Sequence, residues 1–133
     1  MPLSEQQLRE RLEALQRRDE VQRCAIVSYG IDLSKTRVLD LSFWAPDELT
    51  ATQLSEALQR NEGGTPVVLP PADGSQPRWL VGITLNASVD FITAKENVAT
   101  FLLFADKYDC EYDGWGTALV EAAQKMRENP TEL

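Results

Sequence analysis

The sequence predicts an α+β protein in which an antiparallel sheet carries two helices on one face. Three observations lead to this prediction. Between residues 37 and 117 the apolar pattern follows the order strand, helix, strand, strand, helix, strand. The segment PPADGSQP (70–77) is typical of a loop, and it joins the two middle strands as a hairpin. A chain of 133 residues with 43% hydrophobic residues can bury one core. Together these features indicate a split β-α-β, or ferredoxin-like, sandwich.

The length favours a single domain that spans residues 1–133. No internal repeat and no linker divides it. We expect four parts: an N-terminal helix over 1–23, an added strand and turn over 24–36, a ferredoxin-like core over 37–117, and a C-terminal helix or tail over 118–133.

The N-terminal helix is predicted from its start signal. Ser4 and Gln7 have the spacing of a capping box, and three leucines follow at helical spacing: Leu8, Leu12 and Leu15. This apolar stripe is narrow, so we expect the helix at the edge of the domain, ending near Gln22. The next stretch, CAIVSYGI (24–31), is rich in β-forming residues and predicts a strand paired with 37–44.

The core elements follow in chain order. RVLDLSFW (37–44) alternates as a half-buried strand, and a helix then begins at Pro46-Asp47 or one turn later at Thr50 and ends at Gly63-Gly64. Strands are predicted over 65–69 and 78–86. One long helix is expected over 90–108, with a capping box at Thr93 and Glu96 and this stripe: Phe91, Ala94, Val98, Phe101, Leu102, Ala105 and Tyr108. A last strand over 110–117 and a terminal helix over 118–129 complete the chain.

The composition excludes several kinds of chemistry. The chain has no histidine, so it lacks the commonest general base and metal ligand. Cys24 and Cys110 are too far apart for a CxxC site, and we expect two free thiols in a reducing compartment, with a disulfide between them as the alternative. No phosphate-binding glycine loop is present. We therefore predict neither an enzyme nor a cofactor-binding or metal-binding protein.

The net charge points to the class of partner. Thirteen Lys and Arg against 21 Asp and Glu give a formal charge of −8, which repels nucleic acid and anionic membranes and attracts basic protein surfaces. Such acidity also serves simply to keep a protein soluble. The first residues resemble no signal peptide, and no apolar run is long enough to span a membrane, so we expect a cytoplasmic protein.

A few residues remain as candidates. Glu111 and Asp113 share one face of the last strand, beside Asp106 and Asp109; they are either a weak Mg²⁺ site or, as we favour, an ordinary solvated face. Cys110 is interpreted as a small core residue rather than a reactive thiol. Three tryptophans on strands are either core residues or binding anchors: Trp44, Trp79 and Trp115.

The segment ADKYDCEYDGWGT (105–117) resembles the signature of the regulator of ribonuclease E activity B family, in which a helix leads directly into YDGWGT. A looser resemblance extends back to about Arg37, whereas residues 17–36 have no clear counterpart. After GWGT the family continues into a strongly acidic segment, and here ALVEAAQKMRENPTEL follows. The resemblance implies a small bacterial α+β protein that inhibits ribonuclease E by binding it and thereby alters which transcripts are cleaved.

The resemblance also directs attention to one set of candidate partner-binding residues: Asp109, Glu111, Tyr112, Asp113, Gly114, Trp115, Gly116 and Thr117. Within this set, we expect Tyr112 to anchor the strand, the two glycines to permit a bend or bulge, and Asp113 and Trp115 to be presented outward. Two functions remain open: an inhibitor or adaptor that docks on ribonuclease E or its assembly, or an acidic immunity-type module that binds another basic protein.

Overall fold

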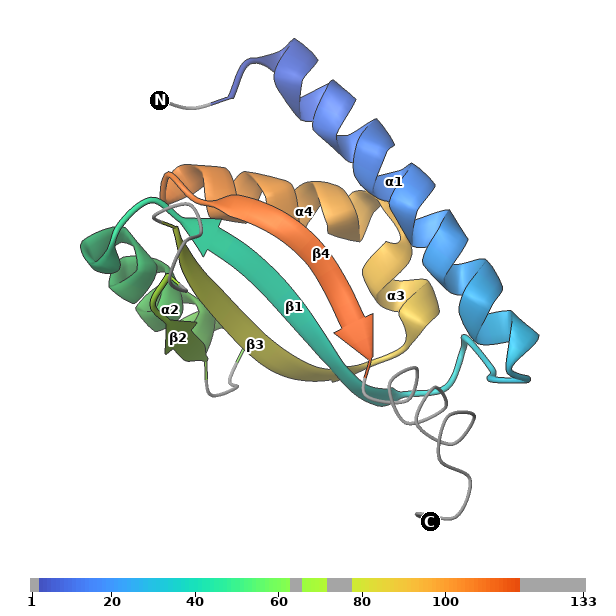
Figure 1. The fold of residues 1–133 in the computed structure, drawn as a ribbon. Coiled ribbons are helices and arrows are strands. Elements are labelled where there is room, and N and C mark those ends of the chain that lie inside the picture. The colour runs from blue at the N-terminus through green and yellow to red at the C-terminus, as the bar shows by residue number, and fades with distance from the viewer. Residues whose placement is uncertain (1–2, 63–65, 72–77, 118–133) are drawn as a thin grey trace.

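The structure is a computed structural model that describes residues 3–62, 66–71 and 78–117. Its elements, shown in Figure 1, are α1 (Glu5–Ser28), β1 (Arg37–Ala45), α2 (Glu48–Glu62), β2 (Val67–Leu69), β3 (Trp79–Ala87), α3 (Val89–Thr93), α4 (Lys95–Lys107) and β4 (Glu111–Thr117). The predicted helix end at Gly63-Gly64, the strand start at Thr65, most of the 70–77 loop and the 118–129 helix lie outside the described residues.

The sheet has the predicted topology. Its strands lie in the order β2-β3-β1-β4, and all neighbours are antiparallel. The α2 connection therefore leads from β1 to β2 with β3 between them, as in a split β-α-β unit. The predicted α+β fold with a four-stranded antiparallel sheet is confirmed.

The two faces of the sheet differ in burial. Alternate residues of the central strands, such as Leu41 and Phe43 on β1 and Val81 on β3, are fully buried and form the core with α2 and α4. The residues between them face the opposite side, where Asp40 and Thr84 are exposed. Figure 1 shows this second face, with α1 running along the β4 side of the sheet. We call it the open face.

The N-terminal helix is longer than predicted, and the predicted strand over 24–31 is wrong. α1 continues to Ser28, and Ile26, at a helical interval from Leu15, is 1% exposed in the core. This burial overrides the β-propensity of the segment. The helix ends where Gly30, at φ 76, allows its own N–H to reach the Val27 carbonyl (2.9 Å) and the next N–H to reach Ile26 (3.4 Å).

The predicted long helix over 90–108 is broken at Ala94. This residue is extended, with ψ 137, and it ends α3 and begins α4. α3 is capped by Ser88 and buries Val89 and Ile92, neither of which belongs to the predicted apolar stripe. Phe91, predicted on the apolar stripe, is 55% exposed. The predicted capping box at Thr93 is absent, because no side chain caps α4.

Candidate protein-binding site

The candidate motif begins where α4 ends. Asp109 adopts a left-handed conformation, with φ 57. Its N–H reaches the Asp106 carbonyl (3.1 Å), and the Cys110 N–H reaches the Ala105 carbonyl (2.9 Å). This pair of bonds is a Schellman ending, in which glycine is the usual left-handed residue. The turn directs the chain straight from α4 into β4.

The first residues of the motif are part of the core, as predicted. Cys110 and Tyr112 are 8% and 4% exposed, and the Tyr112 ring lies 5.3 Å from the rings of both Phe43 and Phe101. Burial, followed by the nearby carboxylates of Asp109 and Asp47, raises the pKa of the Cys110 thiol to about 12. Both cysteines are free, and Cys110 is an unreactive core thiol rather than a nucleophile.

Trp115 is not presented outward, so this expectation is wrong. The side chain is 6% exposed, and its indole N–H donates a 2.8 Å hydrogen bond to Oδ1 of Asp19 on α1. Gln22, one turn further along α1, donates to the Trp115 carbonyl at 3.3 Å. The sheet register explains the burial, because Trp115 lies opposite Leu41 on the core face. Trp115 therefore fastens α1 to the sheet.

A β-bulge at Asp113 determines which face of the sheet the Trp115 side chain occupies. Phe43 pairs with Tyr112 and Ser42 pairs with Gly114, which leaves Asp113 as an extra residue in β4. Gly114 has φ 106, and a Cβ built there stands 3.2 Å from Cζ of Arg18. The Arg18 guanidinium donates to the Asp113 carbonyl. The predicted bulge is present, and it places Tyr112 and the following tryptophan on the same face of the sheet.

The carboxylates of the motif lie at the surface. The side chains of Glu111 and Asp113 are 45% and 44% exposed. Glu111 forms ion pairs with Arg11 (3.4 Å) and Arg78 (3.6 Å), and the Asp113 carboxylate lies 3.8 Å from Arg18. The other two predicted residues, Gly116 and Thr117, pair with Asp40 and Leu39 in the sheet. The motif is thus divided between a buried structural half and an exposed acidic half.

Asp19 is a key residue that the sequence did not reveal. It is 4% exposed, and burial raises the pKa of its carboxyl above the usual value, against the lowering effects of the Trp115 hydrogen bond and of Arg18 and Arg23. The one available signal was its place in the α1 stripe, four residues after Leu15. The nearby Tyr112 hydroxyl is buried and has no hydrogen-bond partner among the described residues, and its pKa is raised by burial and then by the Asp19 charge.

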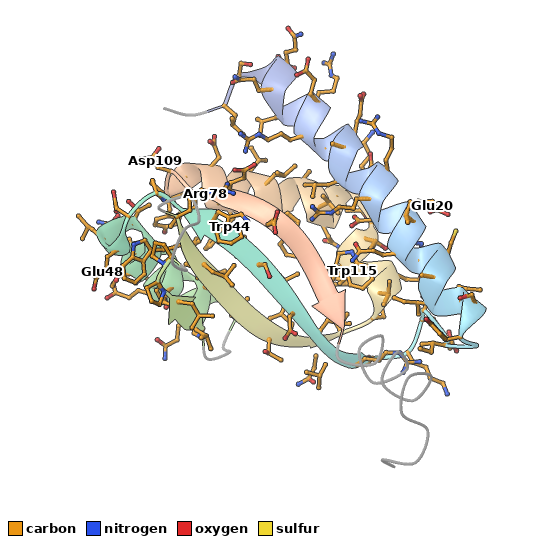
Figure 2. The ribbon with its side chains drawn as sticks, in the orientation of Figure 1. Glu20, Trp44, Glu48, Arg78, Asp109 and Trp115 are labelled. Atoms are coloured by element: carbon orange, nitrogen blue, oxygen red, sulfur yellow. The ribbon has the colours of Figure 1, made fainter. Side chains whose placement is uncertain are left out.

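A pocket lies at the end of the sheet where β1 finishes and β4 begins. It has a volume of about 560 Å³. Its lining combines an indole, two guanidinium groups, three carboxylates and apolar side chains: Leu3, Arg11, Trp44, Ala45, Pro46, Arg78, Asp106, Asp109, Cys110 and Glu111. The Arg78 guanidinium lies 4.8 Å from the centre of the Trp44 ring. Figure 2 shows Trp44, Arg78 and Asp109 at this end and Trp115 at the other, beside α1.

The described residues contain no group of three or more His, Cys, Asp or Glu side chains suited to hold a metal ion. None of the helices described is long and apolar enough to cross a membrane. At the motif, the structure therefore brings together ion-paired charged side chains, packed aromatic rings and the buried carboxylate of Asp19.

Comparison with known proteins identifies the family. Among curated proteins, none matches this chain. The family model described as Regulator of ribonuclease activity B matches residues 20–117, more than half of the chain. The match begins inside α1, so most of residues 17–36, for which we expected no counterpart, is included in the family. The described match ends at the last residue of β4 and takes in the whole YDGWGT motif. The chain belongs to the family Regulator of ribonuclease activity B.

Proposed function

We propose that this protein is a cytoplasmic, non-catalytic inhibitor that binds the endoribonuclease E, or the assembly containing it, and so modulates RNA degradation. The observation that carries the proposal is the family match over residues 20–117, because this family regulates ribonuclease activity rather than catalysing a reaction. Regulation of a large enzyme by a small protein requires a binding surface and no catalytic group of its own.

The chemistry of the motif supports a binding role. Its one thiol, Cys110, is buried with its pKa raised to about 12, and its aromatic residues Tyr112 and Trp115 are in the core. Its exposed carboxylates are Asp109, Glu111 and Asp113, and the last two form ion pairs with arginines of this chain. With a net charge of −8, such a surface favours a basic protein and disfavours direct binding of RNA.

The alternative is an acidic immunity-type module that neutralises a different basic protein. The net charge of −8 suits this function equally well. The family match favours a ribonuclease as the target, because the family is described as a regulator of ribonuclease activity. The resemblance of residues 105–117 to the regulator of ribonuclease E activity B signature directs the proposal to ribonuclease E.

The test is a binding and activity measurement with purified ribonuclease E from the same organism. We expect a stable complex in calorimetry and slower or redistributed RNA cleavage when the protein is added. RNA alone should show no mobility shift with the protein. A ribonuclease E that neither binds the protein nor changes its cleavage pattern in its presence would contradict the proposal, and an affinity for one cationic toxin would favour the alternative.

A further inference from the structure

The open face carries one continuous apolar surface, which we call the Trp44 patch: Trp44, Val67, Leu69 and Leu80. Val67 and Leu69 are 55% and 48% exposed, while Leu80 and Trp44 are half-buried. Leu80 is the direct cross-strand neighbour of both Leu69 and Trp44, so the three side chains form one row across β2, β3 and β1. Val67 lies two residues from Leu69 on the same face, opposite Gly82, which has no side chain to cover it.

The rest of the open face is different. Beyond Gly82, the next cross-strand pair is Asp40 and Thr84, whose side chains share a 2.9 Å hydrogen bond. Val38 follows at the far end, 53% exposed and separated from the Trp44 patch by that polar pair. Exposed apolar residues that adjoin one another indicate a binding surface more strongly than isolated ones.

Acidic groups border the Trp44 patch on one side. The pocket described above shares Trp44 with the patch, and three carboxylates against two guanidinium groups line it. Both guanidinium groups, of Arg11 and Arg78, contact Glu111, and the Asp106 carboxylate accepts the backbone N–H of Leu3 at 3.0 Å. Asp47, directly after the lining residue Pro46, adds a further negative charge. A cation that enters from solvent at this end meets an excess of negative charge.

We propose that the Trp44 patch and the adjoining pocket form the docking surface for a protein segment that presents apolar side chains beside arginine or lysine. This inference rests on the proposed function, since it specifies the part of the partner that binds. The surface crosses the four strands, a distance of about 14 Å at roughly 4.8 Å per strand spacing, which matches a helix of roughly ten residues. The apolar side chains cover Leu69, Leu80 and the part of Trp44 that the Arg78 guanidinium leaves exposed, and the basic ones lie over the acidic border of the pocket.

Charge also decides against two other occupants. A second copy of this chain carries the same net charge of −8 and brings its own carboxylates against those of the first. An RNA strand presents phosphates to the same acidic border. A basic protein segment has the complementary charge.

Two valines of the open face provide a matched pair of variants for the test. Val67 lies in the Trp44 patch and Val38 outside it, and their exposures are 55% and 53%. Binding of purified ribonuclease E is measured for Val67→Lys and Val38→Lys by calorimetry, with thermal unfolding to establish that both are folded. We expect Val67→Lys to weaken binding by about tenfold or more, and Val38→Lys by less than about twofold. Wild-type binding that both variants leave unchanged would overturn the docking surface and leave the proposed function standing.

A second experiment tests the surface without ribonuclease E. The probe is a synthetic helical peptide of leucine and arginine, about 12 residues long, and the control peptide carries glutamate in place of arginine. We expect the arginine peptide to shift NMR signals of β2, β3 and the Trp44 indole, and the glutamate peptide to shift none. Shifts of equal size with both peptides, or shifts confined to other elements, would overturn the inference. A wild-type dimer that Val67→Lys dissociates would also overturn it, because a second copy would then be the occupant.

Discussion

The two ends of β1 and β4 show how one pair of strands supports two different surfaces. At one end Trp115 faces the core, opposite Leu41, and is fixed by a buried carboxylate of α1. At the other end Trp44 faces solvent on the open face, opposite Glu111, beneath an arginine. The bulge at Asp113 separates the two registers. The GWG part of the motif therefore stabilises the fold, whereas the Trp44 end carries the docking surface that we propose.

The largest expected effect compares the two tryptophans. Trp115→Ala should destabilise the protein by roughly 3–5 kcal/mol, because it leaves a cavity and removes the hydrogen bond that satisfies Asp19. Trp44→Ala should lower the free energy of unfolding by about 1 kcal/mol, because Trp44 is half-buried and its replacement removes mainly the contact with Arg78. Urea denaturation of both variants measures the contrast. Equal losses of stability would mean that the two ends do not differ in the way described.

The second contrast is between the two glycines of the motif. Gly114→Val should destabilise by about 2 kcal/mol or more, because Gly114 has φ 106 and a side chain there meets the Arg18 guanidinium. At Gly116 no heavy atom of the described residues, apart from the two chain neighbours, lies within 4 Å of a built Cβ, so Gly116→Ala should change stability by no more than about 0.5 kcal/mol. Denaturation midpoints compare the pair. A tolerated Gly114→Val would show that the bulge adapts to a side chain.

The third prediction concerns pH. The pKa of Asp19 is raised in the folded protein, so the folded state holds its proton more tightly than the unfolded state. The stability contributed by this group is therefore present at low pH and falls as pH rises from the usual aspartate pKa of 3.8 through the raised folded pKa. Asp19→Asn keeps an oxygen that accepts the Trp115 N–H and removes this fall. We expect the variant to be at least as stable as the wild type at neutral pH.

The measurement is the free energy of unfolding of wild type and Asp19→Asn across the acidic range. Asp113→Asn is the control. The Asp113 side chain is 44% exposed, and the substitution removes one negative charge from the same contact between α1 and β4. If Asp19→Asn is markedly less stable than the wild type at neutral pH, the ionised carboxylate is required and its burial is offset by contacts stronger than those described.

The contrast also shows what the sequence could and could not predict. The order of strands and helices and the sheet topology were predictable, because alternation such as that of Leu39, Leu41 and Phe43 records local burial. The strand expected over 24–31 failed because burial of Ile26 against distant elements outweighed local β-propensity. The prediction of one continuous helix over 90–108 failed at Ala94, because a continuous helical period in the sequence does not show where the backbone turns.

The candidate site was harder to predict than the fold. The motif lies within the family match, but the direction of Trp115 depends on one extra residue in β4, and a one-residue shift reverses which face a side chain occupies. Asp19 and Arg18 lie nearly a hundred residues from their partners in β4, and their roles follow only from the packing of α1. The Trp44 patch combines residues of three strands, and only the register brings them together.

The smallest effect is expected at Asp109, where stability and binding should separate. Asp109 occupies the left-handed position at the end of α4, which glycine adopts without steric strain, and its negative charge lies near the negative end of the helix dipole. Asp109→Gly should therefore change stability by at most about 1 kcal/mol, because the relief of the left-handed strain offsets the loss of the side chain's interactions. The same change removes one of the carboxylates that line the pocket, so it should weaken binding of a basic partner and reduce the sensitivity of that binding to salt.

Thermal unfolding and calorimetry at two salt concentrations measure both properties on one variant. Asp109→Asn serves as the control, since it removes the charge while keeping a side chain that tolerates the left-handed conformation. A loss of stability beyond about 1 kcal/mol in Asp109→Gly would show that the Asp109 side chain itself stabilises the turn, and unchanged binding in both variants would leave the other carboxylates of the pocket to attract the partner.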